Sequence, residues 1–80
     1  MLFFKSKQIK NLDYLVDELK NYLSNNYKDA AHDCRVRLKD YADRYYNDGG
    51  ITERQYRHYI GIYKHYTELM KDYYHYRSES

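Results

Sequence analysis

The chain has 80 residues, of which 14 are lysine or arginine and 12 are aspartate or glutamate, giving a formal net charge of +2. A chain of this length forms one domain, whose core hides only about 60% of the surface that the unfolded chain exposes. The balanced charge, with no acidic or basic tail, argues against nucleic acid as the default partner, because phosphate binding usually needs a basic excess or a basic stripe.

Cys34 is the only cysteine, which excludes an intramolecular disulfide and favours a reducing compartment. The apolar residues 1–4 are too few for a signal peptide, and no run of about 20 apolar residues is present to span a membrane. We therefore expect a soluble cytoplasmic protein without a membrane partner. The abundance of Tyr, Lys, Asn and Ile, which have AT-rich codons, is typical of an AT-rich genome, such as that of a bacterium or phage.

Tyrosine dominates the aromatic composition, with 13 tyrosines, two phenylalanines and no tryptophan. A buried tyrosine contributes a large ring but also a hydroxyl that needs a hydrogen-bond partner. The sequence therefore predicts a tyrosine-rich core, and rings that the core does not use are natural contact residues for a partner.

The first predicted helix spans residues 7–24, after an apolar lead-in at residues 1–6 whose last residue, Ser6, is a suitable N-cap. Its apolar residues recur at spacings of three and four, which places them on one helix face. They are Ile9, Leu12, Val16, Leu19 and Leu23, flanked by Leu15 and Tyr22.

The junction at residues 24–26 has no glycine or proline, but its serine and two asparagines favour caps and turns. We predict a loop here, with Asn26 as the N-cap of a helix that starts at Tyr27 and has Asp29 near its positive end. In the alternative, the apolar positions stay in phase across the junction and one long helix covers residues 6–46. That hairpin would dimerise into a four-helix bundle to bury its apolar face.

The second predicted helix spans residues 27–47 and ends at the glycine pair Gly49 and Gly50, the strongest break in the chain. Cys34 lies on its apolar face, which predicts a core thiol rather than a nucleophile. The apolar positions are Tyr27, Ala31, Cys34, Leu38, Tyr41 and Tyr45, with Ala30 and Ala42 beside them.

The third predicted helix spans residues 52–77, and residues 78–80 are expected to fray. Thr52 and Gln55 have the spacing of a capping box, and Ile51 and Tyr56 have the spacing of a hydrophobic staple. Two apolar lines follow, which together cover an arc of roughly 200° at about 100° per residue. One line contains Tyr56, Ile60, Tyr63, Thr67, Met70 and Tyr74; the other contains Ile62, Tyr66, Leu69, Tyr73 and Tyr76.

The candidate metal ligands and nucleophiles are poorly placed for chemistry. His58 and His65 are seven residues apart, which separates them by about 10 Å along a helix, too far to share one zinc ion. The serines lie near helix ends or the terminus and in no nucleophile motif. We therefore predict no enzyme activity, no cofactor and no metal site.

These patterns predict an all-α domain, an up-down-up three-helix bundle that acts by binding. In a three-helix bundle each helix contacts two others, so one alternative is that the wide arc of the third helix lies wholly in the core. The first two helices offer narrow apolar faces, however, so the second line of the third helix is the predicted surface for a protein partner or for a second copy of the chain. Lys64, His65 and Asp72 lie at its edges. An adaptor or an inhibitor is the type of protein that this organisation favours.

The alternative function is nucleic-acid binding by bases that alternate with tyrosines on the third helix. Most of these rings fall on the apolar arc, where packing explains them, and the bases spread around the polar side instead of forming one stripe. Nucleic acid is therefore the second candidate. Its predicted contacts are Arg54, Arg57, Lys64 and Lys71.

Overall fold

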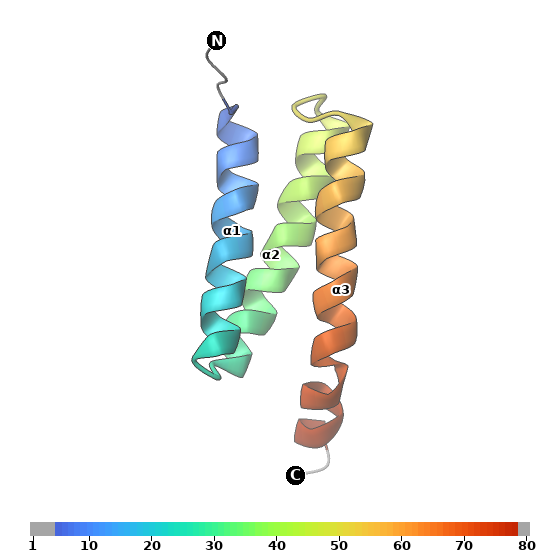
Figure 1. The fold of residues 1–80 in the computed structure, drawn as a ribbon. Helices are drawn as coiled ribbons and strands as arrows, with labels where there is room; N and C mark the ends of the chain where they lie inside the picture. Colours follow the sequence, from blue (N-terminus) through green and yellow to red (C-terminus); the bar gives the residue numbers. More distant parts are fainter. Residues whose placement is uncertain (1–4, 79–80) are drawn as a thin grey trace.

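The computed structural model describes the backbone of residues 5–78 and the side chains of residues 5–72, and in that range the chain forms three α-helices and no strand. Helix α1 spans Lys7–Ser24, α2 spans Lys28–Asn47 and α3 spans Glu53–Ser78. Short turns at opposite ends of the molecule join them into an up-down-up bundle (Figure 1). The three-helix bundle is confirmed and the long hairpin is wrong, because the chain reverses between α1 and α2.

The predicted caps at the starts of α1 and α3 are confirmed. The Ser6 hydroxyl accepts a hydrogen bond from the backbone N–H of Ile9 at 3.2 Å. At the start of α3, the backbone N–H of Thr52 donates to the Gln55 side chain at 2.8 Å, and the backbone N–H of Gln55 donates to the Thr52 hydroxyl at 3.1 Å. This reciprocal capping box fixes the point at which α3 begins.

The role predicted for Asn26 is wrong. Asn26 has a φ of 62° and follows the end of α1, where its N–H donates to the Leu23 carbonyl at 3.1 Å. The next N–H, from Tyr27, donates to the Tyr22 carbonyl at 2.8 Å. This pair of bonds is a Schellman motif, which asparagine supports because it tolerates the left-handed conformation. Asn26 therefore ends α1, and α2 begins after Tyr27 without a side-chain cap.

The turn between α2 and α3 uses the same motif with glycine, as predicted. Gly49 has a φ of 79°, and its N–H donates to the Tyr46 carbonyl at 3.1 Å. The N–H of Gly50 donates to the Tyr45 carbonyl at 2.7 Å. Both turns of the bundle are thus closed by a residue in the left-handed region.

Within the described side chains, the core contains the predicted apolar faces of α1 and α2 and the first predicted line of α3, with two differences; Tyr74 of that line lies outside the described side chains. Tyr27 is 60% exposed, so its assignment to the apolar face of α2 is wrong, because it lies in the turn before that helix. Tyr59 is only 5% exposed, although it belongs to neither predicted line of α3. Among residues 5–72, the buried apolar residues are Leu12, Leu15, Val16, Leu19, Ala31, Cys34, Leu38, Ala42, Ile51, Tyr59 and Met70.

Tyrosine hydroxyls connect each pair of helices by hydrogen bonds, so these hydroxyls have the partners that polar groups in a core need. The α1–α2 contact uses the Asn11 amide as donor, and the two contacts of α3 end on aspartates. Their partners are Tyr45 with Asn11 at 2.8 Å, Tyr56 with Asp43 at 2.6 Å, and Tyr59 with Asp13.

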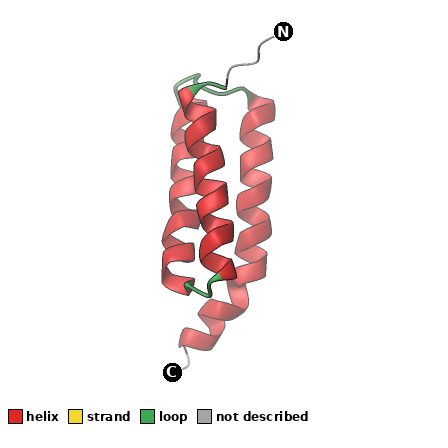
Figure 2. Cartoon of the chain, turned by 60° about the vertical axis from the view of Figure 1, so that its left-hand side comes forward, coloured by secondary structure: helices red, strands yellow, loops and turns green. Residues whose placement is uncertain are grey.

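The three helices are unequally spaced. Helix α2 packs closely against both others, whereas the backbones of α1 and α3 make few close approaches. With 26 residues, α3 is longer than α1 with 18 and α2 with 20, and its C-terminal part extends beyond the bundle (Figure 2). Among the described residues, no helix has the length and apolar character needed to cross a bilayer.

Candidate functional site

A groove lies between α1 and α3, on the side of the bundle where the helices are least closely packed. We call it the α1–α3 groove, and its volume is about 370 Å³. Apolar side chains from both helices form its walls, and basic or imidazole side chains stand at its edges. The lining residues are Val16, Lys20, His58, Gly61, Ile62, His65 and Tyr66.

The register of the groove follows from the contact between Tyr59 and Asp13. Because α1 and α3 run in the same direction, this contact brings residues three further along each helix to the same level. Those residues are Val16 on α1 and Ile62 on α3, which line the same hollow. Tyr66, one turn after Ile62, continues the α3 wall and is half-buried.

Towards Ser6 the groove continues into a second hollow of about 410 Å³ and becomes more polar. Asp13 lies here and forms an ion pair with Lys5 at 2.8 Å. Burial alone would raise the pKa of Asp13, but hydrogen bonds from Lys5 and Tyr59 outweigh it, so this pKa lies below its usual value. Asp17 also lines this hollow. Val16, Lys20, His58 and Ile62 line both hollows, so Asp13 and Asp17 lie near these residues, and the part of the groove away from carboxylates is at Gly61, His65 and Tyr66.

The predicted partner-binding line lies partly along the groove. Ile62 and Tyr66 form part of its wall, and Leu69, the next residue of the line, is 53% exposed. The side chains of Tyr73 and Tyr76 lie outside the described residues. Among the predicted edge residues, His65 borders the groove, and Lys64 and Asp72 are exposed.

A third hollow, of about 600 Å³, lies on the other side of α3, facing α2. Two of its cations have carboxylate partners on their own helices: Lys39 pairs with Asp43 at 2.5 Å, and Arg57 pairs with Glu53 at 2.6 Å. We call it the α2–α3 hollow. Its lining residues are Lys39, Tyr56, Arg57, Ile60, Gly61 and Lys64.

The four residues predicted for nucleic-acid binding are all exposed on α3. Glu53 pairs with Arg57, and Glu68 pairs with Lys71 at 2.5 Å, so carboxylates already accompany two of the four cations. Arg54 lies beside Arg57 at the start of the helix, and Lys64 lies nearer its middle. The tyrosines between these bases are buried or half-buried, which leaves little ring surface for stacking on nucleobases.

Arg35 is a buried residue that the sequence reasoning did not identify. It is 6% exposed and donates a hydrogen bond to the Thr67 hydroxyl at 2.7 Å. Its guanidinium also lies over the Tyr63 ring, 5.2 Å from the ring centre, in a cation–π arrangement. Arg35 therefore explains why the first line of α3 includes a threonine: that line packs against a polar side chain of α2.

The prediction of a core thiol is confirmed. Cys34 is buried and its thiol donates to the Leu15 carbonyl at 3.2 Å. Burial raises the pKa of Cys34 to about 11, and the nearby charge of Glu18 adds to this rise. Within the described part of the chain, no three His, Cys, Asp or Glu side chains are grouped so that they could hold a metal ion.

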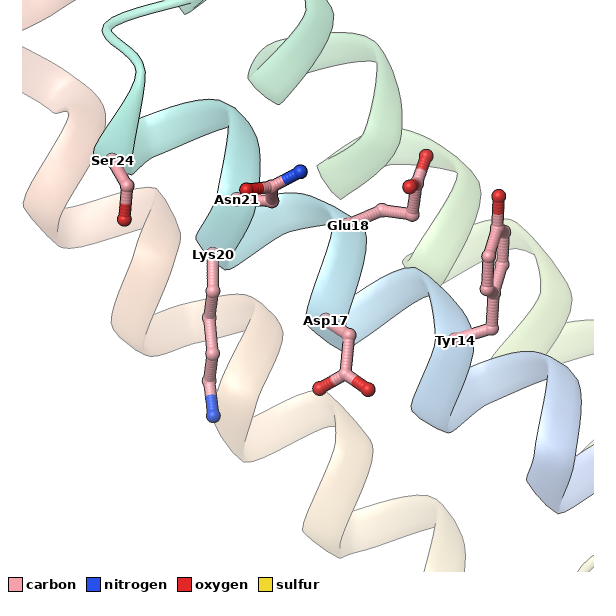
Figure 3. A pocket seen from close by; sticks show the side chains of 6 residues that line it. All are labelled: Tyr14, Asp17, Glu18, Lys20, Asn21 and Ser24. Atoms are coloured by element: carbon pink, nitrogen blue, oxygen red, sulfur yellow. The ribbon is translucent and has the colours of Figure 1, made fainter.

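A further depression, of about 440 Å³, runs along the exposed side of α1 (Figure 3). All of its lining residues come from this one helix, so no second element closes it. In Figure 3, Asp17 and Lys20 leave α1 on the side of α3, whereas Tyr14 and Glu18 leave it on the side of α2. Lys20 therefore links this depression to the α1–α3 groove, which is the better enclosed site.

A comparison of the chain with models of protein families, with curated proteins and with solved structures finds no match.

Proposed function

We propose that this chain is a non-enzymatic helical module that binds a partner protein by accepting one of the partner's helices along the α1–α3 groove. The observation that carries the proposal is an apolar wall that the chain covers only in part. Val16 is buried at the floor of the groove, Ile62 and Tyr66 are half-buried against the core, and Leu69 continues the wall as an exposed side chain. Exposed apolar side chains with polar edges are typical of partner sites.

The shape of the groove favours a helix as the bound element. Its walls are two helices running in the same direction, and a third helix laid between them would complete a four-helix arrangement. Ile62, Tyr66 and Leu69 are spaced four and three residues apart. A bound helix with apolar residues at the same spacings would meet them one turn at a time.

Charge favours a different protein over a second copy of the chain as the partner. A symmetric dimer would place the same patch of both copies face to face. The groove itself is lined by Lys20 and two histidines but by no carboxylate, so two copies of it would meet without an acidic group to pair with Lys20. A partner with carboxylates at these places supplies that acidic group.

The proposal is tested by site-specific photo-crosslinking in the native host. We would place benzoylphenylalanine at His65 or Leu69, and as a control at Val36, an apolar residue of α2 that is 38% exposed and lines neither hollow. We expect one partner protein to be captured from the first two positions and not from Val36. Equal capture from all three positions would contradict a specific groove.

Purified components then measure the affinity. Leu69→Glu and Val36→Glu form a matched pair, because each introduces the same charge at an exposed aliphatic position. We expect Leu69→Glu to weaken binding of the captured partner at least tenfold and Val36→Glu to leave it unchanged, with both melting temperatures close to that of the parent. Equal affinities of the two variants would refute the proposal.

Nucleic-acid binding by Arg54, Arg57, Lys64 and Lys71 remains the second candidate. It is supported by the gathering of exposed cations on α3. Affinity that depends on phosphate contacts falls steeply with salt. A shift of DNA or RNA at physiological salt, abolished by Arg57→Glu with Lys64→Glu, would favour this candidate over a protein partner.

A further inference from the structure

Gly61 lies in the interior of α3, where glycine is a poor helix former. Neither its conformation nor its surroundings within the chain explain it. Its φ is not positive, and a Cβ added at this position would meet no atom within 4 Å. Glycine does serve where another molecule approaches the backbone closely, so Gly61 is informative about what lies outside the chain.

Two hollows meet at Gly61. It lines the α1–α3 groove on one side of α3 and the α2–α3 hollow on the other. Because Gly61 has no side chain, nothing projects from the α3 backbone at the point where the two hollows adjoin. A helix that lies in the α1–α3 groove can therefore come close to the α3 backbone at Gly61 and reach past it, with apolar side chains against Ile62 on one side and Ile60 on the other.

Basic and imidazole side chains surround Gly61, and two of these cations, Arg57 and Lys39, are paired with Glu53 and Asp43. The helix neighbours of Gly61 at spacings of three and four are all basic or imidazole side chains, and all are exposed: Arg57, His58, Lys64 and His65. Lys20 of α1 and Lys39 of α2 stand on either side. Among the described residues, neither Lys20 nor Lys64 forms an ion pair, and no carboxylate lines either of these two hollows.

We propose that the partner helix is amphipathic with an acidic face, and that it lies in the α1–α3 groove with its backbone close to Gly61. Its apolar residues enter the two hollows, and its carboxylates meet Lys20 and Lys64 beside the histidines. This inference rests on the proposed function and specifies the partner that the groove accepts. Glycine at position 61 lets the backbones of α3 and the partner helix come close, because the separation of packed helices depends on the side chains at their contact.

The same observations favour an acidic helix over nucleic acid. Both hollows have apolar walls, formed by Val16, Ile62 and Tyr66 on one side and by Tyr56 and Ile60 on the other. Phosphates and sugars gain nothing from such walls, whereas leucine or phenylalanine side chains do.

A displayed peptide library tests the proposal. Each peptide has 18 residues with leucines at helical spacing, and the remaining positions are randomised among Glu, Lys, Gln and Ser. We would select it against the purified chain at 150 mM salt. We expect glutamate to be enriched among the selected peptides. We expect those peptides to bind at least tenfold more weakly to Gly61→Leu and to Lys64→Glu, and equally well to Arg37→Glu, a matched charge change on α2 away from both hollows.

The variants separate this inference from the proposed function. Gly61→Leu has open space for its side chain and improves helix propensity, so an unchanged or higher melting temperature shows that it folds. The selected peptides could instead be rich in lysine or glutamine and still bind Leu69→Glu more weakly than the parent. That result would overturn the acidic face of the partner helix, while the proposed binding in the α1–α3 groove would stand. If no peptide prefers the parent over Leu69→Glu, the groove fails as well. Binding of a 20-base-pair DNA duplex in place of the peptides, lost in Lys64→Glu, would assign the patch to nucleic acid.

Discussion

Tyr59 is the most buried tyrosine of the described part of the chain, and its hydroxyl joins α3 to Asp13 of α1. Burial, together with this hydrogen bond to a carboxylate, raises the pKa of Tyr59 well above its usual value of 10. The unfolded chain therefore ionises first as the pH rises. The stability from neutral Tyr59 is fully present below pH 10 and is lost as the pH increases above it.

Tyr59→Phe tests this dependence. At pH 8 we expect the variant to lose about 1–2 kcal/mol of unfolding free energy, since it removes a hydrogen bond to a charged group. Between pH 9 and pH 11, however, the variant should lose less stability than the parent. Urea denaturation at each pH gives both values, with Tyr27→Phe, a change at an exposed ring, as the control. If the parent and Tyr59→Phe lost equal amounts of unfolding free energy between pH 9 and pH 11, Tyr59 would not govern alkaline unfolding.

Cys34 provides a second test at the level of one residue. With its pKa raised to about 11, the buried thiol has almost no thiolate at pH 8, and the thiolate is the reactive form. We expect Cys34 to react with Ellman's reagent at least a hundredfold more slowly in the native chain than in 6 M guanidinium chloride. A native rate close to the denatured rate would contradict the burial of this side chain.

At the scale of elements, both turns depend on one residue in the left-handed conformation. A side chain other than asparagine or glycine costs about 1 kcal/mol there. We expect Asn26→Ala and Gly49→Ala each to lower the free energy of unfolding by about 1 kcal/mol, and Asn26→Gly to keep it within a few tenths. Thermal melts of the three variants measure this. If Asn26→Ala were as stable as the parent, the left-handed turn after α1 would be in doubt.

Replacing Gly61, within α3, should have the opposite effect on stability from replacing Gly49. Because a Cβ at this position meets nothing, Gly61→Ala should stabilise the free chain by about 0.5–1 kcal/mol through helix propensity alone. Chemical denaturation of the variant measures the gain. A loss of stability would mean that the surroundings of Gly61 are tighter than the structure indicates.

The ends of the helices show which elements a sequence predicts and which it does not. The glycine pair and the Thr52–Gln55 box each have one structural meaning, so the end of α2 and the start of α3 were predictable. Asn26 has two possible structural roles, because asparagine both caps helix starts and tolerates the left-handed region. Its role depends on the backbone conformation, which the sequence alone does not specify.

At the scale of the whole molecule, the candidate site was only half predictable. The apolar line with Ile62, Tyr66 and Leu69 could be found because helical spacing is a property of α3 alone. The part that α1 contributes, Val16 and Lys20, depends on how far one helix is shifted along another, and side-chain contacts such as that of Tyr59 determine this shift. Gly61 was visible as an isolated glycine in a helical pattern, but its two adjoining hollows appear only when three helices are packed.

The tyrosine hydroxyl contacts between helices that residues 5–72 form are all found in one end of the bundle, which makes its two ends differ in interhelical hydrogen bonding. The three contacts found among the described side chains all lie on the side of the turn at residues 48–52, since their partners are Asn11, Asp13 and Asp43. Native-state amide hydrogen exchange should therefore be graded along the molecule. Amides near that turn should exchange only through global unfolding, with the full dependence on denaturant. Amides next to the turn at residues 25–27 should exchange through smaller openings, so that the bundle opens from that end first.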